Sequence, residues 1–141
     1  MRFLEEFTAT VSNLLKAQRM TTDFDAIMQA NLAQVFGERD PQRRINAIRK
    51  LYATNATLFE PERAVYGHDA ISHAVGHLLE TLPQDFLFTA LRPAVGHHGV
   101  GRLPWQSGPA GGAAAVTGLD VAHVENGLIQ TLHVFLDPPG A

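Results

Sequence analysis

Two carboxylic acids are the first candidates for acid–base chemistry in this sequence, and Asp120 is the more unusual of them. It alternates with small or apolar residues at Val116, Gly118, Ala122 and Val124. If this stretch is a strand, all five positions face the same side of a sheet. Burial disfavours the charged form of a carboxyl group and raises its pKa. Asp120 therefore has the setting of a hydrogen-bond donor or a general acid.

Glu60 is the second acid. It ends a short, β-prone segment that Pro61 closes. Strand alternation places its side chain on the same face as Ala56 and Leu58. Both acids also have a purely structural interpretation, in which Glu60 caps a turn and Asp120 pairs with a buried amide.

Other site chemistries find less support. The chain has no cysteine, which excludes a thiolate nucleophile, a disulfide and a cysteine metal site. His73 and His77 have the spacing of a metal-binding pair, but they share a helical face with Glu80 and are interpreted as solvent-exposed. His123 and His133 fall on adjacent predicted strands, where they could meet or serve an interface. We predict no metal and no cofactor.

Length and composition indicate one soluble domain. The chain has 141 residues, of which 45% are hydrophobic and 18% charged. A formal net charge of −3 argues against a nucleic-acid partner. No apolar run approaches the roughly 20 residues needed to span a bilayer, so no membrane partner is expected. Residues 1–20 include Glu5 and Glu6 and have no continuous apolar centre, so they do not resemble a signal peptide and we expect a cytoplasmic protein.

Periodicity predicts the elements that position the two acids. Apolar residues recur every three or four positions in four helices, near 1–20, 23–36, 40–52 and 68–82. Extended segments are predicted at 54–60, 64–66, 85–96, 101–106, 114–124 and 128–137. Asn126-Gly127 is a strong hairpin signal between the last two. Helices followed by a meander of strands predict an α+β domain.

Three stretches resemble the nuclear transport factor 2-like superfamily, in its SnoaL-like and ketosteroid isomerase-like branches. Residues 51–58 are similar to its helix-to-strand junction, residues 67–71 to its glycine-led helix start, and residues 117–129 to its terminal hairpin. The resemblance covers about 22–137 of a single domain, 1–141, and leaves 1–20 as an added helix. It implies a cone-shaped, curved antiparallel or mixed sheet wrapped by N-terminal helices around an apolar pocket.

The ketosteroid isomerase branch matches the two acids best. There the acid before the proline shuttles a proton and the acid of the terminal hairpin polarises a carbonyl oxygen, which implies these roles for Glu60 and Asp120. The phenolic donor of that branch falls near Asn31, and Tyr52 lies one helical turn short of the strand.

Two other branches differ at their diagnostic stretches. Polyketide cyclases usually have His-Trp-Asp where this chain has Leu132-His133-Val134, and epoxide hydrolases have Arg-x-Asp where it has Gly118-Leu119-Asp120. Three functions follow: a cofactor-independent isomerase- or cyclase-like enzyme on a small apolar carbonyl compound, a non-catalytic ligand-binding or dimeric assembly module, and an epoxide hydrolase-like protein. The residues expected to line the pocket are Asn31, Tyr52, Leu58, Trp105, Val116, Ala122, Leu132 and Val134.

A homodimer through the outer face of the sheet is also expected. The odd-numbered residues Leu119, Val121, Ile129 and Phe135 would otherwise leave an apolar sheet face in water. The apolar stripe of helix 1–20 predicts that this helix docks on the domain or on its partner.

Overall fold

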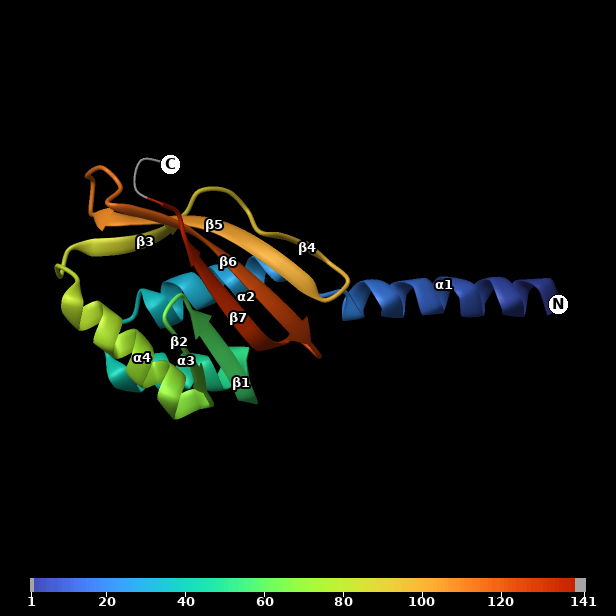
Figure 1. The fold of residues 1–141 in the computed structure, drawn as a ribbon. Helices are drawn as coiled ribbons and strands as arrows, with labels where there is room; N and C mark the ends of the chain where they lie inside the picture. Colours follow the sequence, from blue (N-terminus) through green and yellow to red (C-terminus); the bar gives the residue numbers. More distant parts are fainter. Residues whose placement is uncertain (1, 139–141) are drawn as a thin grey trace.

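The computed structural model describes residues 2–138 and confirms the α+β class (Figure 1). The helical elements are α1 (Arg2–Met20), α2 (Phe24–Asn31), the π-helix η1 (Leu32–Phe36), α3 (Pro41–Leu51) and α4 (His68–Thr81). The strands are β1 (Tyr52–Glu60), β2 (Arg63–Tyr66), β3 (Phe86–Ala90), β4 (Val95–His97), β5 (Val100–Pro109), β6 (Val116–Glu125) and β7 (Leu128–Leu136).

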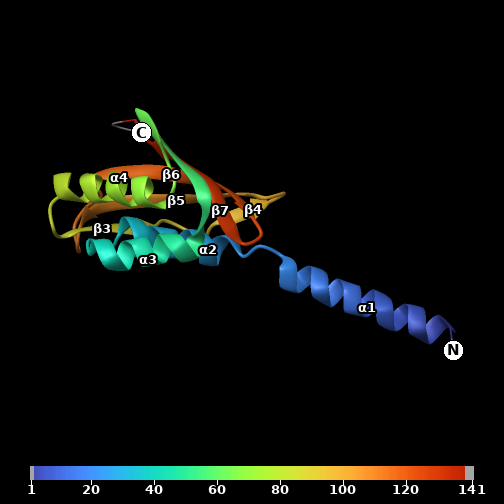
Figure 2. The same ribbon diagram turned by 90° about the horizontal axis from the view of Figure 1, so that it is seen from below.

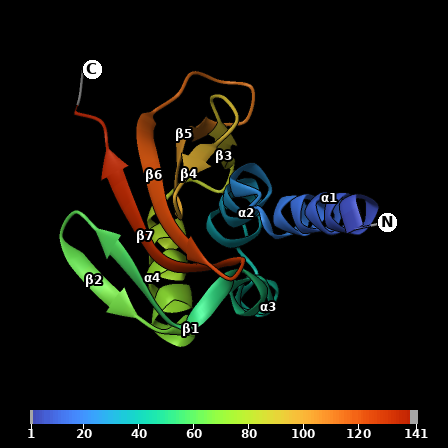
Figure 3. The same ribbon diagram turned by 90° about the vertical axis from the view of Figure 1, so that its right-hand side faces the viewer.

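The strands form one mixed sheet, as predicted. Their order is β2-β1-β7-β6-β5-β3. Strand β4 pairs with the first three residues of β5, on the same edge as β3. All pairs are antiparallel except β1 with β7. The sheet curls around α2, α3 and α4, which lie against its concave face (Figure 3). Among the helices of residues 2–138, none lies over the opposite, convex face.

Local sequence signals explain where the helices begin and end. Asp23 caps α2 by accepting a hydrogen bond from the backbone N–H of Ala26 at 2.9 Å. Asp40 caps α3 in the same way, and Pro41 occupies the first helical position. The predicted helix 23–36 is α2 continued into a π-helical turn that ends at Gly37.

Two predicted boundaries are corrected. The expected strand 85–96 is two strands, because the chain leaves β5 after Leu91 and includes Pro93, which has no N–H for a ladder. The expected third helix ends at Leu51, and Tyr52 already belongs to β1.

A β-bulge in β7 corrects the predicted outer row. Val124 pairs with Ile129, whereas His123 pairs with Thr131, so Gln130 has no partner on β6. The extra residue reverses the alternation along β7. Ile129 is therefore fully buried and does not belong to the outer face, while Phe135 remains 53% exposed there.

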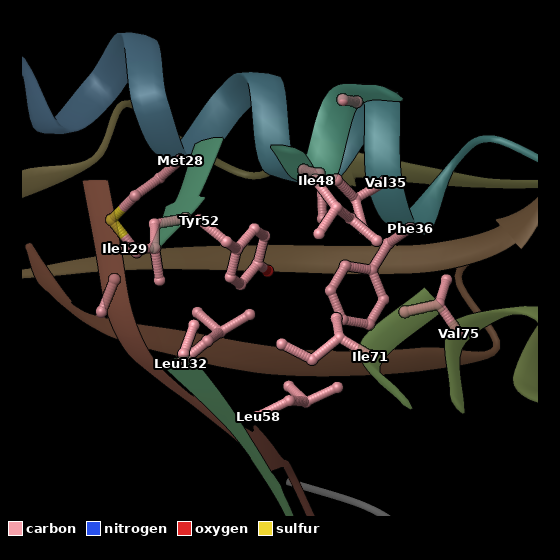
Figure 4. Close-up of a cluster of buried hydrophobic side chains, with 14 of the residues drawn as sticks. Met28, Val35, Phe36, Ile48, Tyr52, Leu58, Ile71, Val75, Ile129 and Leu132 are labelled. Carbon is pink, nitrogen blue, oxygen red and sulfur yellow. The ribbon is translucent and has the colours of Figure 1, made fainter. Parts of the chain in front are cut away.

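The hydrophobic core fills the space between the concave face and the helices. Figure 4 shows side chains from helices and strands meeting there. The labelled members are Met28, Val35, Phe36, Ile48, Tyr52, Leu58, Ile71, Val75, Ile129 and Leu132. This packing determines which side chains of β1, β5 and β6 face the concave side of the sheet.

Helix α1 extends away from the rest of the domain (Figures 1 and 2). Its side chains at Phe3, Leu4 and Phe7 are 75%, 62% and 61% exposed. The prediction that this helix docks on its own domain is therefore wrong, and docking on a partner stays a prediction. Within residues 2–138, no helix combines the length and the hydropathy that crossing a bilayer requires.

Candidate functional site

A largely apolar cavity of about 160 Å³ lies between the concave face of the sheet and the helices η1 and α4. The sheet contributes Glu60, Trp105, Ser107, Val116, Asp120 and Val134 to its wall, and the helices contribute Leu32, Phe36 and Leu78. The wider turn of a π-helix is often found at functional sites, and here both ends of η1 reach the cavity. The two acids that the sequence singled out thus line one cavity.

Asp120 lies on β6, between Leu103 of β5 and Val134 of β7. Its side chain faces inward as the alternation predicted, and the residue is only 3% exposed. Burial raises the pKa of the Asp120 carboxyl from its ordinary value of 3.8 to about 7, although a hydrogen bond from Trp105 acts in the opposite direction. Near neutral pH this carboxyl group is therefore present in both protonation states.

Trp105 is the direct partner of Asp120. Its Nε1–H donates to Asp120 Oδ1 at 2.9 Å, from the neighbouring strand β5. The indole can reach across because Gly118 lies opposite Trp105, and a Cβ at Gly118 would overlap the indole Cζ2. Sequence reasoning placed Trp105 at the pocket but missed this bond. The signal that could have found it is a glycine inside a strand pattern two residues before the acid.

Glu60 lies at the end of β1, where the β1–β2 hairpin turns. Arg63 is its register partner on β2, and Arg63 Nε contacts Glu60 Oε1 at 3.0 Å. The glutamate side chain is 19% exposed and the arginine side chain 46%. Glu60 and Pro61 also border shallower hollows outside the main cavity, which places Glu60 at its mouth.

Five other residues that we expected at the pocket lie in the core. Leu58, Ala122 and Leu132 are fully buried there. The Tyr52 hydroxyl donates to Asn31 Oδ1 at 2.5 Å. Burial, reinforced by the nearby negative charge of Asp120, raises the pKa of Tyr52 well above its usual range. Tyr52 and Asn31 therefore form a buried polar pair behind the cavity wall.

The histidines do not assemble into a site. His73 and His77 are exposed on α4, as expected. The sheet register pairs His123 with Thr131 and His133 with Val121, so the two histidines are not direct partners. Among residues 2–138, no three His, Asp or Glu side chains come together in a way that could hold a metal ion.

Together, the curved mixed sheet and the N-terminal helices against its concave face define the nuclear transport factor 2-like fold. Many solved structures share it. A SnoaL-like family protein from Agrobacterium tumefaciens, provisionally named an isomerase, is 24% identical, with a TM-score of 0.74 over 80% of this chain and 96% of that one.

Two further solved structures show the spread of this fold. A provisionally named SnoaL-like polyketide cyclase from Jannaschia is 12% identical over 83% of this chain and 90% of its own, with a TM-score of 0.63. A provisionally named ketosteroid isomerase from Kribbella flavida is 14% identical over 83% and 82%, with a TM-score of 0.58. No family model matches the sequence, and no curated protein matches it. At these identities the likeness establishes the fold alone.

Proposed function

We propose that this protein is a cofactor-independent acid–base enzyme, isomerase- or cyclase-like, that acts on a small and largely apolar carbonyl compound. The observation that supports this most is Asp120, a carboxyl group buried in an apolar cavity with a pKa of about 7. A buried carboxylic acid that keeps its proton near neutral pH can donate a hydrogen bond to a carbonyl oxygen. Ketosteroid isomerases use an acid of this kind, so analogy with that branch supports the role alongside the physical argument.

Trp105 determines which oxygen of Asp120 can donate. An indole N–H is a donor only, so Asp120 Oδ1 must act as the acceptor. The proton then resides on Oδ2, which is free to donate to the substrate. As negative charge develops on the substrate oxygen, this hydrogen bond strengthens in the low-dielectric cavity, and one such donor contributes about 3 kcal/mol to lowering the barrier.

Glu60 is the proposed base. Its carboxylate would remove a proton from the carbon next to the carbonyl, and the electron pair of that C–H bond would move to form an enolate whose oxygen Asp120 stabilises. In a β,γ-unsaturated substrate the enolate extends over the neighbouring double bond, and return of the proton to the γ-carbon completes an isomerisation. Attack by the enolate carbon on a second carbonyl would instead close a ring. The contact with Arg63 holds Glu60 in place at the mouth of the cavity.

A non-catalytic ligand-binding module is the second candidate. It is favoured by the ion pair itself, because Arg63 already engages Oε1 of the proposed base. The epoxide hydrolase alternative has weaker support. Its arginine would stand at Gly118, where the indole of Trp105 leaves no room for a side chain.

A homodimer through the convex face belongs to the same proposal. Phe59, His133 and Phe135 stack there, with ring centroids 4.4 Å apart for the first pair and 6.3 Å for the second. Leu119 and Val121 are half-buried on the neighbouring strand. A second copy would cover this apolar row, over which no helix of the described part of the chain lies.

Hydrogen–deuterium exchange at the methyl group of acetophenone tests the enzyme function directly. In D₂O, the wild-type protein should speed this exchange, as followed by proton NMR. Glu60→Gln should abolish the effect, and Asp120→Leu should reduce it by about 10²-fold or more. Glu62→Gln, which changes an exposed carboxylate in the same turn, is the matched control and should retain full activity. Binding of the ketone without any accelerated exchange would favour the binding module.

A further inference from the structure

Ser107 is a buried hydroxyl in the cavity wall with no hydrogen-bond partner. The residue is 3% exposed, and within the described part of the chain no group accepts from or donates to its Oγ. It lies on β5 between Phe88 of β3 and Val116 of β6, both of which also line the cavity. Its backbone carbonyl is already used, because it accepts from the N–H of Ala115.

This situation is an exception in the molecule. The other buried polar side chains of the described residues all have partners: Asn31 with Tyr52, Ser72 with Arg44, and Asp120 with Trp105. Leaving a buried hydroxyl unpaired is unfavourable, by about tenfold in the folding equilibrium constant or more. A buried polar group of this kind in a cavity wall is what a ligand group can satisfy.

We propose that Ser107 is a second hydrogen-bonding subsite, which recognises an oxygen of the ligand other than the carbonyl oxygen at Asp120. This inference rests on the proposed function, because it takes Asp120 as the group that meets the carbonyl. The predicted substrate is therefore an apolar ring or short chain that carries a ketone at one end and a hydroxyl or second carbonyl at the other. The serine hydroxyl can either donate or accept, so both groups would be recognised.

The sheet register gives the separation of the two ligand oxygens. Asp120 pairs with Leu103, and Ser107 lies four residues further along β5. Four strand residues rise about 13 Å. If both hydrogen bonds of about 2.8 Å point along the line between the two side chains, about 7 Å remains between the ligand oxygens. A ketone and a hydroxyl on opposite sides of a single six-membered ring have close to this spacing, and a cavity of about 150 Å³ holds one such ring.

Two matched probes test the subsite. 4-Hydroxyacetophenone carries the second oxygen, and 4-methylacetophenone replaces it with a methyl group of similar size. Because Trp105 is the only tryptophan, its indole N–H gives one NMR signal next to Asp120 with which binding can be followed. Ser107→Ala should weaken the hydroxyl probe about tenfold and leave the methyl probe unchanged or tighter. Equal effects on the two probes, or none, would overturn the proposal.

The same titration separates this inference from the proposed function. Suppose that the methyl probe binds the wild type and that Asp120→Leu weakens this binding. If Ser107→Ala then changes the affinities for the two probes equally, the subsite is wrong and the proposed carbonyl site stands. If neither probe shifts the Trp105 signal, both are wrong. We expect both probes to bind the wild type. The preference for the hydroxyl probe over the methyl probe should be lost only in Ser107→Ala.

A measurement without ligand provides a further check. Ser107→Ala removes an unpaired hydroxyl and should leave the melting temperature unchanged or slightly higher. Ser72→Ala is the matched control, because its buried hydroxyl accepts from Arg44 Nε at 3.2 Å. That variant should melt about 4 °C lower. An equal loss in both variants would show that the Ser107 hydroxyl is already paired inside the protein, and would overturn the subsite.

Discussion

Replacing Asp120 by asparagine should remove a specific pH dependence of folding stability. Asparagine has nearly the same shape, does not titrate and keeps an oxygen that can accept from Trp105. The wild-type protein should lose stability relative to this variant as the pH rises. The reason is that the folded state holds the Asp120 proton more tightly than the unfolded chain does, because burial raises the pKa of the folded carboxyl group.

The sign and size of the effect follow from linkage. The pKa is 3.8 when the group is solvated and about 7 when it is folded. Between these values the native state binds more protons than the unfolded state, so its stability falls with increasing pH. The stability that the protonated Asp120 contributes is fully present below about pH 4 and is lost as the pH rises through about 7. A difference of about three pKa units corresponds to on the order of 4 kcal/mol.

Urea unfolding at a series of pH values measures this difference. The free energy of unfolding of Asp120→Asn, subtracted from that of the wild type, should decline from about pH 4 and level off above about pH 7. Asp85→Asn changes an exposed aspartate and should keep the wild-type slope. A flat difference would show that Asp120 is hydrated in the folded protein, and one that rises with pH would show that the fold stabilises its carboxylate. The donor role proposed for it would then be refuted.

Three other perturbations have definite outcomes. Gly118→Ala should lower the free energy of unfolding by about 2 kcal/mol, because its Cβ overlaps the Trp105 indole, and wild-type stability in urea would contradict this packing. Phe135→Glu places a charge on the proposed dimer interface, so this variant should sediment as a monomer. A wild type that is monomeric at micromolar concentration would refute the proposed dimer. Deleting residues 1–20 should lower the melting temperature of the dimer, because a partner subunit is the surface left for the apolar stripe of α1 to dock on. An unchanged melting temperature and oligomeric state would show that α1 does not dock.

The sequence by itself determined the features that depend on neighbours along the chain. Asp23 and Asp40 mark helix starts because a capping side chain bonds a backbone N–H only a few residues away. Asn126-Gly127 marks the last hairpin for a similarly local reason. The inward position of Asp120 followed from strict alternation along one unbroken strand, β6. These signals were enough for the fold class and for the inward-facing acid that lines the cavity.

Only the tertiary structure decided how separate strands meet. The bulge that buries Ile129, the bond from Trp105 to Asp120 and the unpaired hydroxyl of Ser107 all depend on register and on contacts between distant segments. A stripe of apolar residues predicted that α1 is amphipathic, but not that it leaves the domain. Strand periodicity repeats every two residues, so one unpaired residue reverses every later side chain, and no local pattern reports which strand supplies a partner.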